Sequence, residues 1–391
     1  MITGGYYNPV PPMKNFNLDA ILEAMLKVSD RVSDLNFSVG RPPQVEVDGQ
    51  LVPVNFPGLP RLTPFQTEMI AMHMLRGDRE LTRALMTNGS VDLSYSIPQK
   101  TRFRVNIFSQ RGTYAIVLRV IPEGVPSLES LKLPRELWNI PSLKNGIVLV
   151  TGPTGSGKST TLAALINEIN QNHAYHIITI EDPVEYMHRH VKSTVNQREV
   201  GSDTRTFSLA LRAALRQAPK VILIGEMRDV ETIEIAMEAA ETGHLVLSTL
   251  HTIDAAKTVD RIIGVFPKDQ EPQIRTRLSQ SFRYVISQRL LPKIGGGRIA
   301  ALEILKSTMR TRDYVVKGES EGRSLIDAMH DGSVDGMQTF DDEIEKLWQQ
   351  RVISKETALA YATNPVNLAL RLGDENLTPA DEGDSMLSML E

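Results

Sequence analysis

Nine consecutive residues, 152–160, read GPTGSGKST and match the pattern G-x-x-x-x-G-K-[ST] in full. The motif follows the apolar run GIVLV (146–150) and precedes the helix-forming run TTLAALINEI (160–169). In such a strand–loop–helix context the loop N–H groups surround a phosphate, and the helix N-terminus adds partial positive charge. The sequence therefore predicts a nucleotide site formed by Gly152, Pro153, Thr154, Gly155, Ser156, Gly157, Lys158, Ser159 and Thr160.

Two side chains of this loop carry chemistry of their own. Lys158 is placed to reach the β- and γ-phosphate oxygens, and the Ser159 hydroxyl is placed to ligate Mg²⁺. The alternative is a glycine-rich turn that happens to contain a lysine. The strand before the loop and the helix after it favour the phosphate site.

A second candidate is the stretch KVILIGEMRD (220–229), in which a buried-strand pattern runs into Gly225 and Glu226. Ligands of open α/β sheets bind at the carboxyl ends of the strands. Glu226 is therefore expected to face Mg²⁺, directly or through a water molecule. Glycine occupies the place of the aspartate that such strands usually carry. The alternative is a carboxylate that caps the following helix.

A third stretch, TIEDPVEY (179–186), places Glu181, Asp182 and Glu185 where another strand ends. Pro183 stops the strand and turns the chain, so these carboxylates gather at the same sheet edge. One of them is suited to polarise the water that attacks the γ-phosphate. Spacing alone does not choose among them, and a solvated acidic turn is the alternative.

The stretch TGHLVLSTLHT (242–252) places His244 and His251 at the two ends of one strand. No third His or Cys lies at metal-ligand spacing, which argues against a zinc site. Two interpretations remain open: a sensor that hydrogen-bonds the γ-phosphate, or two structural histidines.

The elements that must position these residues divide the chain into parts. Residues 1–16 are predicted to form a flexible lead, and 17–122 an α+β domain with a helix from Asn17, an Asp-Gly hairpin over 44–54, a helical pair over 64–87 and three strands. Residues 123–145 are predicted to form a linker. Strand-like runs then alternate with helices over 146–370, which predicts a parallel α/β sheet that becomes mostly helical beyond about 270. Residues 371–391 are predicted to be a disordered acidic tail.

Composition narrows the function classes. The 391 residues carry a net charge of −4, include 5% aromatic residues and contain no cysteine. Neither a basic field nor stacking platforms for nucleic acid are therefore expected. The cysteine-free chain fits a reducing cytosol. Its first residues lack a signal-peptide pattern, and no apolar run approaches the ~18 residues that cross a bilayer.

Five motifs in order resemble those of the secretion-superfamily ATPases, and in particular the type IV pilus retraction ATPases of the PilT/PilU type: GPTGSGKSTTLAAL, TIEDPVEY, NQREVG, VILIGEMRDVETI and ETGHLVLSTLHT. SDLNFSVGRPPQVEVDGQL (33–51) and SQRLLPKIGGGRIAALEIL (287–305) extend the likeness to about residues 17–370. The resemblance implies an α/β protein, with a PAS-like N-terminal domain followed by a RecA-like P-loop NTPase domain and a helical C-terminal part.

The resemblance also implies roles for single residues. Lys158 and Ser159 belong to Walker A, Glu226 to an atypical Walker B, Glu185 is the catalytic base, and His244 and His251 form the histidine box. The family works with ATP and Mg²⁺ as a cytoplasmic homo-hexamer at the inner membrane, against a pilus platform protein. Arginines of one subunit's N-terminal domain reach the nucleotide of its neighbour, and the candidates are Arg104, Arg111 and Arg119.

Two features of the sequence favour a retraction ATPase over an assembly ATPase. A third feature bears on which kind of retraction ATPase this chain resembles. Assembly ATPases of this superfamily typically carry a tetracysteine zinc site and a longer N-terminal region, neither of which this chain shows. PilT proteins carry an AIRNLI segment near the position where this chain reads STMRTRDYV (307–315). The later regions of this chain resemble PilU. We therefore expect a retraction motor that supports twitching motility, or an accessory ATPase beside a paralogous motor. A RecA-like nucleic-acid translocase is the alternative of a different class.

Overall fold

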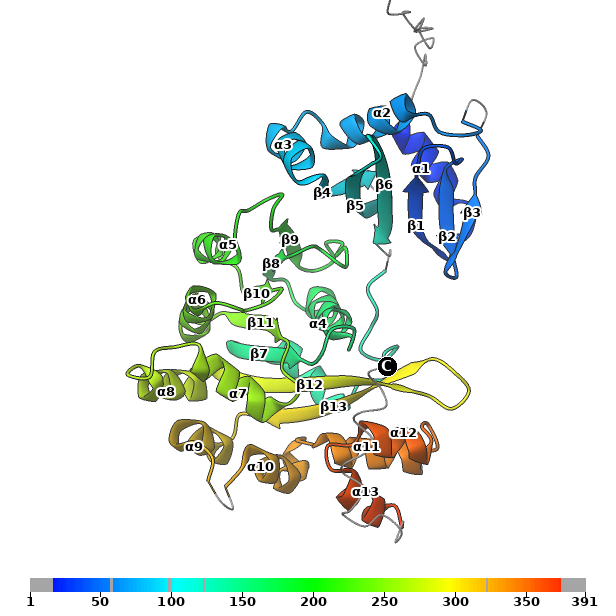
Figure 1. The fold of residues 1–391 in the computed structure, drawn as a ribbon. Coiled ribbons are helices and arrows are strands. Elements are labelled where there is room, and N and C mark those ends of the chain that lie inside the picture. The colour runs from blue at the N-terminus through cyan, green and yellow to red at the C-terminus, as the bar shows by residue number, and fades with distance from the viewer. Residues whose placement is uncertain (1–16, 57–58, 98–99, 122–123, 321–322, 374–391) are drawn as a thin grey trace, which may run out of the picture. The chain divides into compact units, whose positions relative to one another are not determined.

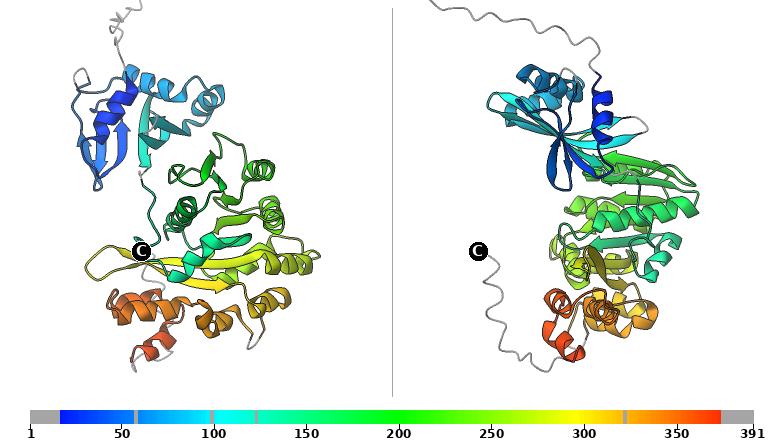
Figure 2. Two further views of the ribbon diagram at one scale, coloured as in Figure 1. Left: turned by 180° about the vertical axis from the view of Figure 1, so that it is seen from behind. Right: turned by 90° about the vertical axis from the view of Figure 1, so that its right-hand side faces the viewer.

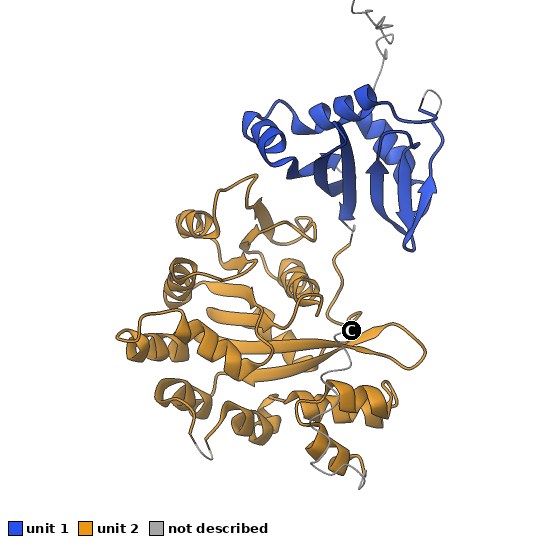
Figure 3. Cartoon of the chain, viewed as in Figure 1, with its two compact units in different colours: residues 1–123 blue, residues 124–391 orange. Residues whose placement is uncertain are grey.

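The computed structural model describes residues 17–56, 59–97, 100–121, 124–320 and 323–373. Two compact units make up the chain, residues 1–123 and 124–391 (Figure 3). The predicted lead 1–16 lies outside the described residues, as does nearly all of the predicted tail. Among the residues described, no helix is both long enough and apolar enough to span a bilayer.

The first unit is an α+β domain built on a six-stranded antiparallel sheet of order β3-β2-β1-β6-β5-β4 (Figure 1). Helices α1, α2 and α3 share one apolar core with this sheet. The elements are α1 (Leu18–Leu26), β1 (Val32–Phe37), β2 (Gln44–Val47), β3 (Gln50–Pro53), α2 (Pro64–Leu75), α3 (Arg79–Asn88), β4 (Ser90–Ile97), β5 (Thr101–Gln110) and β6 (Thr113–Ile121).

Local chemistry explains where these elements begin and turn. The Asn17 side chain accepts the N–H of Ala20 at 3.1 Å and so caps α1 as predicted. The β2–β3 hairpin turns at Asp48 and Gly49, whose φ angles of 53° and 80° are the positive values that an Asp-Gly type I′ turn requires. The predicted helical pair and the three predicted strands correspond to α2, α3 and β4 to β6.

The second unit is built on a seven-stranded sheet of order β13-β12-β7-β11-β10-β8-β9. All neighbours are parallel except β12 and β13. The elements of its first part are η1 (Arg135–Ser142), β7 (Gly146–Thr151), α4 (Lys158–Asn172), β8 (His176–Glu181), β9 (Thr194–Glu199), α5 (Phe207–Ala214), β10 (Val221–Ile224), α6 (Val230–Glu241), β11 (Leu245–Leu250), α7 (Ala255–Gly264) and α8 (Glu271–Ser281). Those of its second part are β12 (Phe282–Pro292), β13 (Arg298–Lys306), α9 (Met309–Lys317), α10 (Leu325–Asp331), η2 (Ser333–Asp335), α11 (Phe340–Gln349), α12 (Lys355–Tyr361) and α13 (Pro365–Arg371).

Apolar side chains cover both faces of this sheet. Alternate residues of β7 belong to different cores: Ile147 and Leu149 pack with α5 to α8, whereas Val148 and Val150 pack with α4 and η1. This is why the strands appear in the sequence as continuous apolar runs. Four runs predicted as strands, at 146–150, 176–180, 221–225 and 245–249, form β7, β8, β10 and β11.

Two regions differ from the sequence expectations. The chain beyond residue 270 is largely helical, as predicted, but it also contains β12 and β13, which form a long antiparallel hairpin, yellow in Figures 1 and 2, that projects beyond the parallel strands. Its mixed apolar and polar runs fit a helix as well as a strand, and only pairing with β7 selects the strand. The segment from Gly124 belongs to the second unit, where Leu128, Leu137 and Ile140 are buried.

Candidate nucleotide site

The phosphate loop lies at the carboxyl end of β7 and opens α4. Gly157 is the N-cap of α4 with a φ of 90°. A Cβ at Gly152, whose φ is 143°, would collide with the Gln288 carbonyl oxygen, and one at Gly157 would lie 2.8 Å from Gln288 Nε2. Both positions therefore need glycine for conformation and for space. The loop therefore lies between a strand and a helix N-terminus, as the motif predicts, and its binding of a phosphate stays a prediction.

Lys158 is folded back onto this loop. Its side chain is 8% exposed, and Nζ donates to the carbonyl oxygens of Gly152 at 2.9 Å and Pro153 at 3.0 Å. Burial lowers the pKa of Lys158, while the charges of Glu185 and Glu226 oppose that shift. A buried cation within the field of two carboxylates is ready to exchange carbonyl partners for phosphate oxygens.

The loop forms one wall of a pocket of about 540 Å³. The other walls come from the carboxyl ends of β8, β10 and β11, and from the start of β13. The lining residues that matter for chemistry are Lys158, Ser159, Thr160, Glu181, Asp182, Glu185, Tyr186, Glu226, Thr249 and His251. The fold thus brings the phosphate loop together with both acidic strand ends and one of the two histidines.

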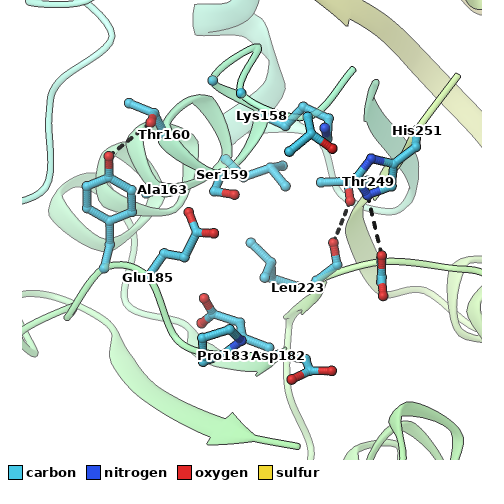
Figure 4. A pocket seen from close by; sticks show the side chains of 18 of the residues that line it. Lys158, Ser159, Thr160, Ala163, Asp182, Pro183, Glu185, Leu223, Thr249 and His251 are labelled. Atoms are coloured by element: carbon cyan, nitrogen blue, oxygen red, sulfur yellow. Dashed lines mark hydrogen bonds and ion pairs between the residues drawn. The ribbon is translucent and has the colours of Figure 1, made fainter. Parts of the chain in front are cut away.

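The three acidic residues at the end of β8, Glu181, Asp182 and Glu185, all line the pocket, but Glu181 and Glu185 differ in their partners. Figure 4 shows Glu185 and Ser159 both turned into this space. Within the described residues, the exposed Glu185 carboxylate has no hydrogen-bond or ion-pair partner. Glu181 differs, because it accepts from Thr179 Oγ1 at 2.6 Å and Gln197 Nε2 at 3.1 Å, and burial raises its pKa. The geometry thus distinguishes carboxylates that spacing leaves equivalent.

Glu226 follows β10 and lies between two basic side chains. Arg228 Nε is 2.6 Å from Glu226 Oε1, and His251 Nε2 is 3.5 Å from Glu226 Oε2. The strand ends are also tied to each other, since Thr249 Oγ1 donates to the Gly225 carbonyl at 2.6 Å (Figure 4). The Glu226 side chain is 15% exposed and lines the pocket rather than capping the next helix, whose N-cap is Asp229.

Known proteins resemble this chain in sequence and in structure. Residues 62–353 match the family described as "Type II/IV secretion system protein". The chain belongs to this family. It is 44% identical over 337 residues to the type IV pilus retraction ATPase PilT of Pseudomonas aeruginosa, a match that covers 86% of this chain and 95% of that protein. It is 41% identical over 354 residues to the pilus ATPase PilU of the same organism, covering 90% of this chain and 91% of PilU.

Solved structures agree with these relatives. A crystal structure of the pilus retraction motor PilT with bound ADP superposes with a TM-score of 0.79 at 43% identity, covering 90% of this chain and 99% of that one. The ATPase DotB of Legionella pneumophila superposes with a TM-score of 0.75 at 29% identity, covering 87% and 94%. The resemblance to PilT/PilU-type ATPases and the predicted fold class are therefore confirmed, and membership of this family indicates an ATP-hydrolysing enzyme.

The family's two histidines lie far apart in this chain. His251 follows the carboxyl end of β11 and lines the pocket. His244 precedes the other end, where its Nδ1 lies 2.9 Å from the Ala239 carbonyl oxygen. At ~3.3 Å per strand residue the two are on the order of 20 Å apart. The chain does not bring His244 to its own pocket, and its role in hydrolysis stays a prediction.

The three candidate arginines belong to the first unit. Arg104 on β5 faces Arg119 on β6 in register, and Arg111 lies in the turn between these strands with a φ of 48°. All three are exposed, and Arg119 Nε lies 3.0 Å from Asp34 Oδ1. Their action on a neighbouring subunit's nucleotide stays a prediction.

Sequence reasoning missed two residues that support the phosphate loop. Gln288, 3% exposed on β12, accepts from Thr161 Oγ1 at 2.8 Å and donates to the Ser156 carbonyl at 2.7 Å. Tyr186 places its hydroxyl 2.9 Å from Thr160 Oγ1. A glutamine in a strand with apolar residues on both sides of it is the signal that could have identified the first, because buried amides need partners.

Proposed function

We propose that the chain hydrolyses ATP at this pocket with the help of Mg²⁺. The loop amides and Lys158 hold the triphosphate, and Glu185 positions the attacking water and accepts its proton. His251 contacts Glu226 and lies where it can report the presence of a γ-phosphate. The observation that carries the proposal is the convergence of the buried Lys158, the unpartnered Glu185 and Glu226 in one pocket.

The residues present fit a magnesium ion bound together with the nucleotide. Mg²⁺ takes oxygen ligands and is usually held by one or two protein groups, the substrate phosphates and water. The Ser159 hydroxyl and the Glu226 carboxylate supply such oxygens in the pocket. Accordingly, in the described part of the chain no cluster of three or more acidic, His or Cys side chains forms a complete protein cage. When bound, the metal would neutralise charge on the phosphates.

The work driven by hydrolysis is proposed to be retraction of type IV pili, which supports twitching motility. The support is the names of the relatives: a pilus retraction ATPase, a pilus retraction motor and a twitching motility protein of Neisseria gonorrhoeae that is 43% identical over 328 residues. We further infer a cytoplasmic homo-hexamer, peripheral at the inner membrane, that acts on a pilus platform protein. In this ring Arg104, Arg111 and Arg119 would act on the neighbouring subunit's nucleotide.

Deletion of the gene tests this function in the cell. If the protein is a retraction motor, the deletion strain should carry excess pili and show no twitching. The wild-type gene should restore twitching, and the Glu185→Gln variant should not. Loss of pili in the deletion strain would indicate assembly instead. Unchanged pilus number and motility would contradict a role in pilus dynamics, even if the purified protein hydrolyses ATP.

An accessory role beside a paralogous motor is the second candidate. The segment 307–315, which differs from the AIRNLI segment of PilT proteins, contributes to α9. In this helix Met309 is 89% exposed, and Arg310 pairs with Asp331 at 2.8 Å. The PilU match also covers more of the chain than the PilT match. Expression in a strain that lacks every retraction ATPase separates the two roles: a primary motor restores twitching alone, whereas an accessory motor requires its paralogue.

A further inference from the structure

A network of hydroxyl groups contacts the loop that carries His251. Thr252 Oγ1 lies 2.6 Å from Thr258 Oγ1, and Thr258 Oγ1 lies 3.4 Å from Thr151 Oγ1 at the end of β7. Thr151 in turn donates to Ser287 Oγ on β12 at 3.0 Å. The network therefore joins the histidine loop to the strand that bears the phosphate loop.

Glu303 on β13 ends this network beneath the start of α7. Its side chain is 3% exposed, and its Oε1 accepts the N–H of Ala255, the first residue of α7, at 2.7 Å. It lies opposite Ser287 in the β12–β13 register and also accepts a hydrogen bond from that side chain. No sequence motif for nucleotide chemistry contains Glu303, and it does not line the pocket.

Two charged residues act on Glu303, one at the start of α7 and one on β12. Asp254, the N-cap of α7, repels its negative charge, while Arg289 on β12 attracts it. Arg289 also donates to the Tyr361 carbonyl at 2.6 Å, lies over the Phe340 ring and feels the charge of Asp341. Arg289 therefore connects the surroundings of Glu303 with the C-terminal helices α11 and α12.

We propose that Glu303 is a positioning residue for ATP hydrolysis: its carboxylate holds the first N–H of α7 and thereby fixes the 251–254 loop, with His251 against Glu226. This inference rests on the proposed roles of His251 and Glu226. A carboxylate at a helix N-terminus makes a stronger, charge-assisted bond than a neutral acid does. Ionisation of Glu303 therefore orders the loop, and protonation loosens it.

The carboxyl group of Glu303 titrates near neutral pH. Burial raises its pKa to about 7, with Asp254 adding to the shift and Arg289 and the Ala255 N–H opposing it. The wild-type turnover number should therefore rise with pH across this range. Since the phosphate loop does not contact Glu303, the KM for ATP should change little.

The variant Glu303→Gln tests the inference, because glutamine keeps the shape and the acceptor oxygen but cannot ionise. Steady-state hydrolysis is measured from pH 6 to 8.5, with a fluorescent ADP analogue reporting nucleotide affinity. We expect the rising limb of kcat to flatten, with kcat at pH 8 about tenfold lower and KM retained. Glu343→Gln is the matched control: this partly buried carboxyl group on α11 also has a pKa raised by burial. Its side chain faces Lys346 and Gln338, not α7.

Each outcome of this experiment supports or contradicts the inference. If the rise of kcat with pH persists in Glu303→Gln, another group causes it, and the inference is overturned. A rise in KM at unchanged kcat, or a flattened limb in Glu343→Gln as well, also overturns it. If Lys158→Ala remains fully active, the proposed site itself is wrong. If Lys158→Ala is inactive and only the Glu303 result fails, the site stands and the positioning role falls.

Discussion

His251 Nε2 lies 3.5 Å from Glu226 Oε2, although the two residues belong to different strand ends. The contact exists because β10 and β11 are parallel neighbours, with Ile224 opposite Ser248 in register. A ligand that engages His251 therefore also alters the surroundings of Glu226. The contact links the strand end that we propose to hold the metal with the strand end that we propose to sense the phosphate.

Substitution of Lys158 by alanine should abolish hydrolysis. The change removes the buried cation that faces the phosphates, and loss of one such preorganised group costs about 10²-fold or more. Phosphate release measured with purified protein checks this. The exposed Lys192→Ala is the matched control and should hydrolyse ATP normally. Thermal unfolding near the wild-type value would show that the fold persists; normal turnover by Lys158→Ala would contradict the phosphate-site assignment.

The variant Glu185→Gln should retain nucleotide affinity and lose turnover by about 10²–10⁴-fold, the usual worth of a general base. The reason is that glutamine cannot accept the proton of the attacking water. Fluorescent nucleotide binding and phosphate release measure the two effects separately. Glu129→Gln, the same change at an exposed residue that does not line the pocket, is the control. Should Glu226→Gln show this phenotype while Glu185→Gln stays active, the base has been assigned to the wrong residue.

Replacing Gln288 by alanine should weaken both the fold and nucleotide binding. Two buried groups, the Ser156 carbonyl and the Thr161 hydroxyl, lose their partner. An unsatisfied buried polar group costs about 1–3 kcal/mol. Urea unfolding gives the loss in stability, and titration with ADP gives the loss in affinity. The exposed Gln280→Ala serves as the reference; equal behaviour of the two variants would contradict a supporting role for Gln288.

The stability of the wild type relative to Glu303→Gln should fall as pH rises. Burial lifts the folded-state pKa of Glu303 from 4.5 to about 7, so between these values the folded state binds more protons than the unfolded state. Stability then decreases with pH, because ionisation of the buried group is unfavourable. The full effect is at most about 3 kcal/mol. Urea unfolding at pH 5 and pH 8 measures it, with the exposed Glu129→Gln as control. A pH-independent difference would contradict the raised pKa.

Local patterns were sufficient to predict much of the fold. The Asp48-Gly49 hairpin and the cap at Asn17 depend on the conformational preferences of a few adjacent residues. The sequence did not predict β12 and β13, because an apolar run with scattered polar residues satisfies both helical and strand periodicities. Pairing along β7, more than a hundred residues earlier in the chain, selects the strand.

The candidate site, too, was predicted only in part from the sequence. The sequence by itself determined the phosphate loop at Lys158, because loop, strand and helix are contiguous and their chemistry is local. Only the tertiary structure decided that Glu181 is hydrogen-bonded to Thr179 and Gln197, that His251 meets Glu226 while His244 lies at the far end of β11, and that Gln288 contacts the phosphate loop from β12. The same holds for Glu303, which contacts the start of α7 from β13. These relationships depend on strand order and burial, which arise from pairing between distant segments that no short stretch of sequence encodes.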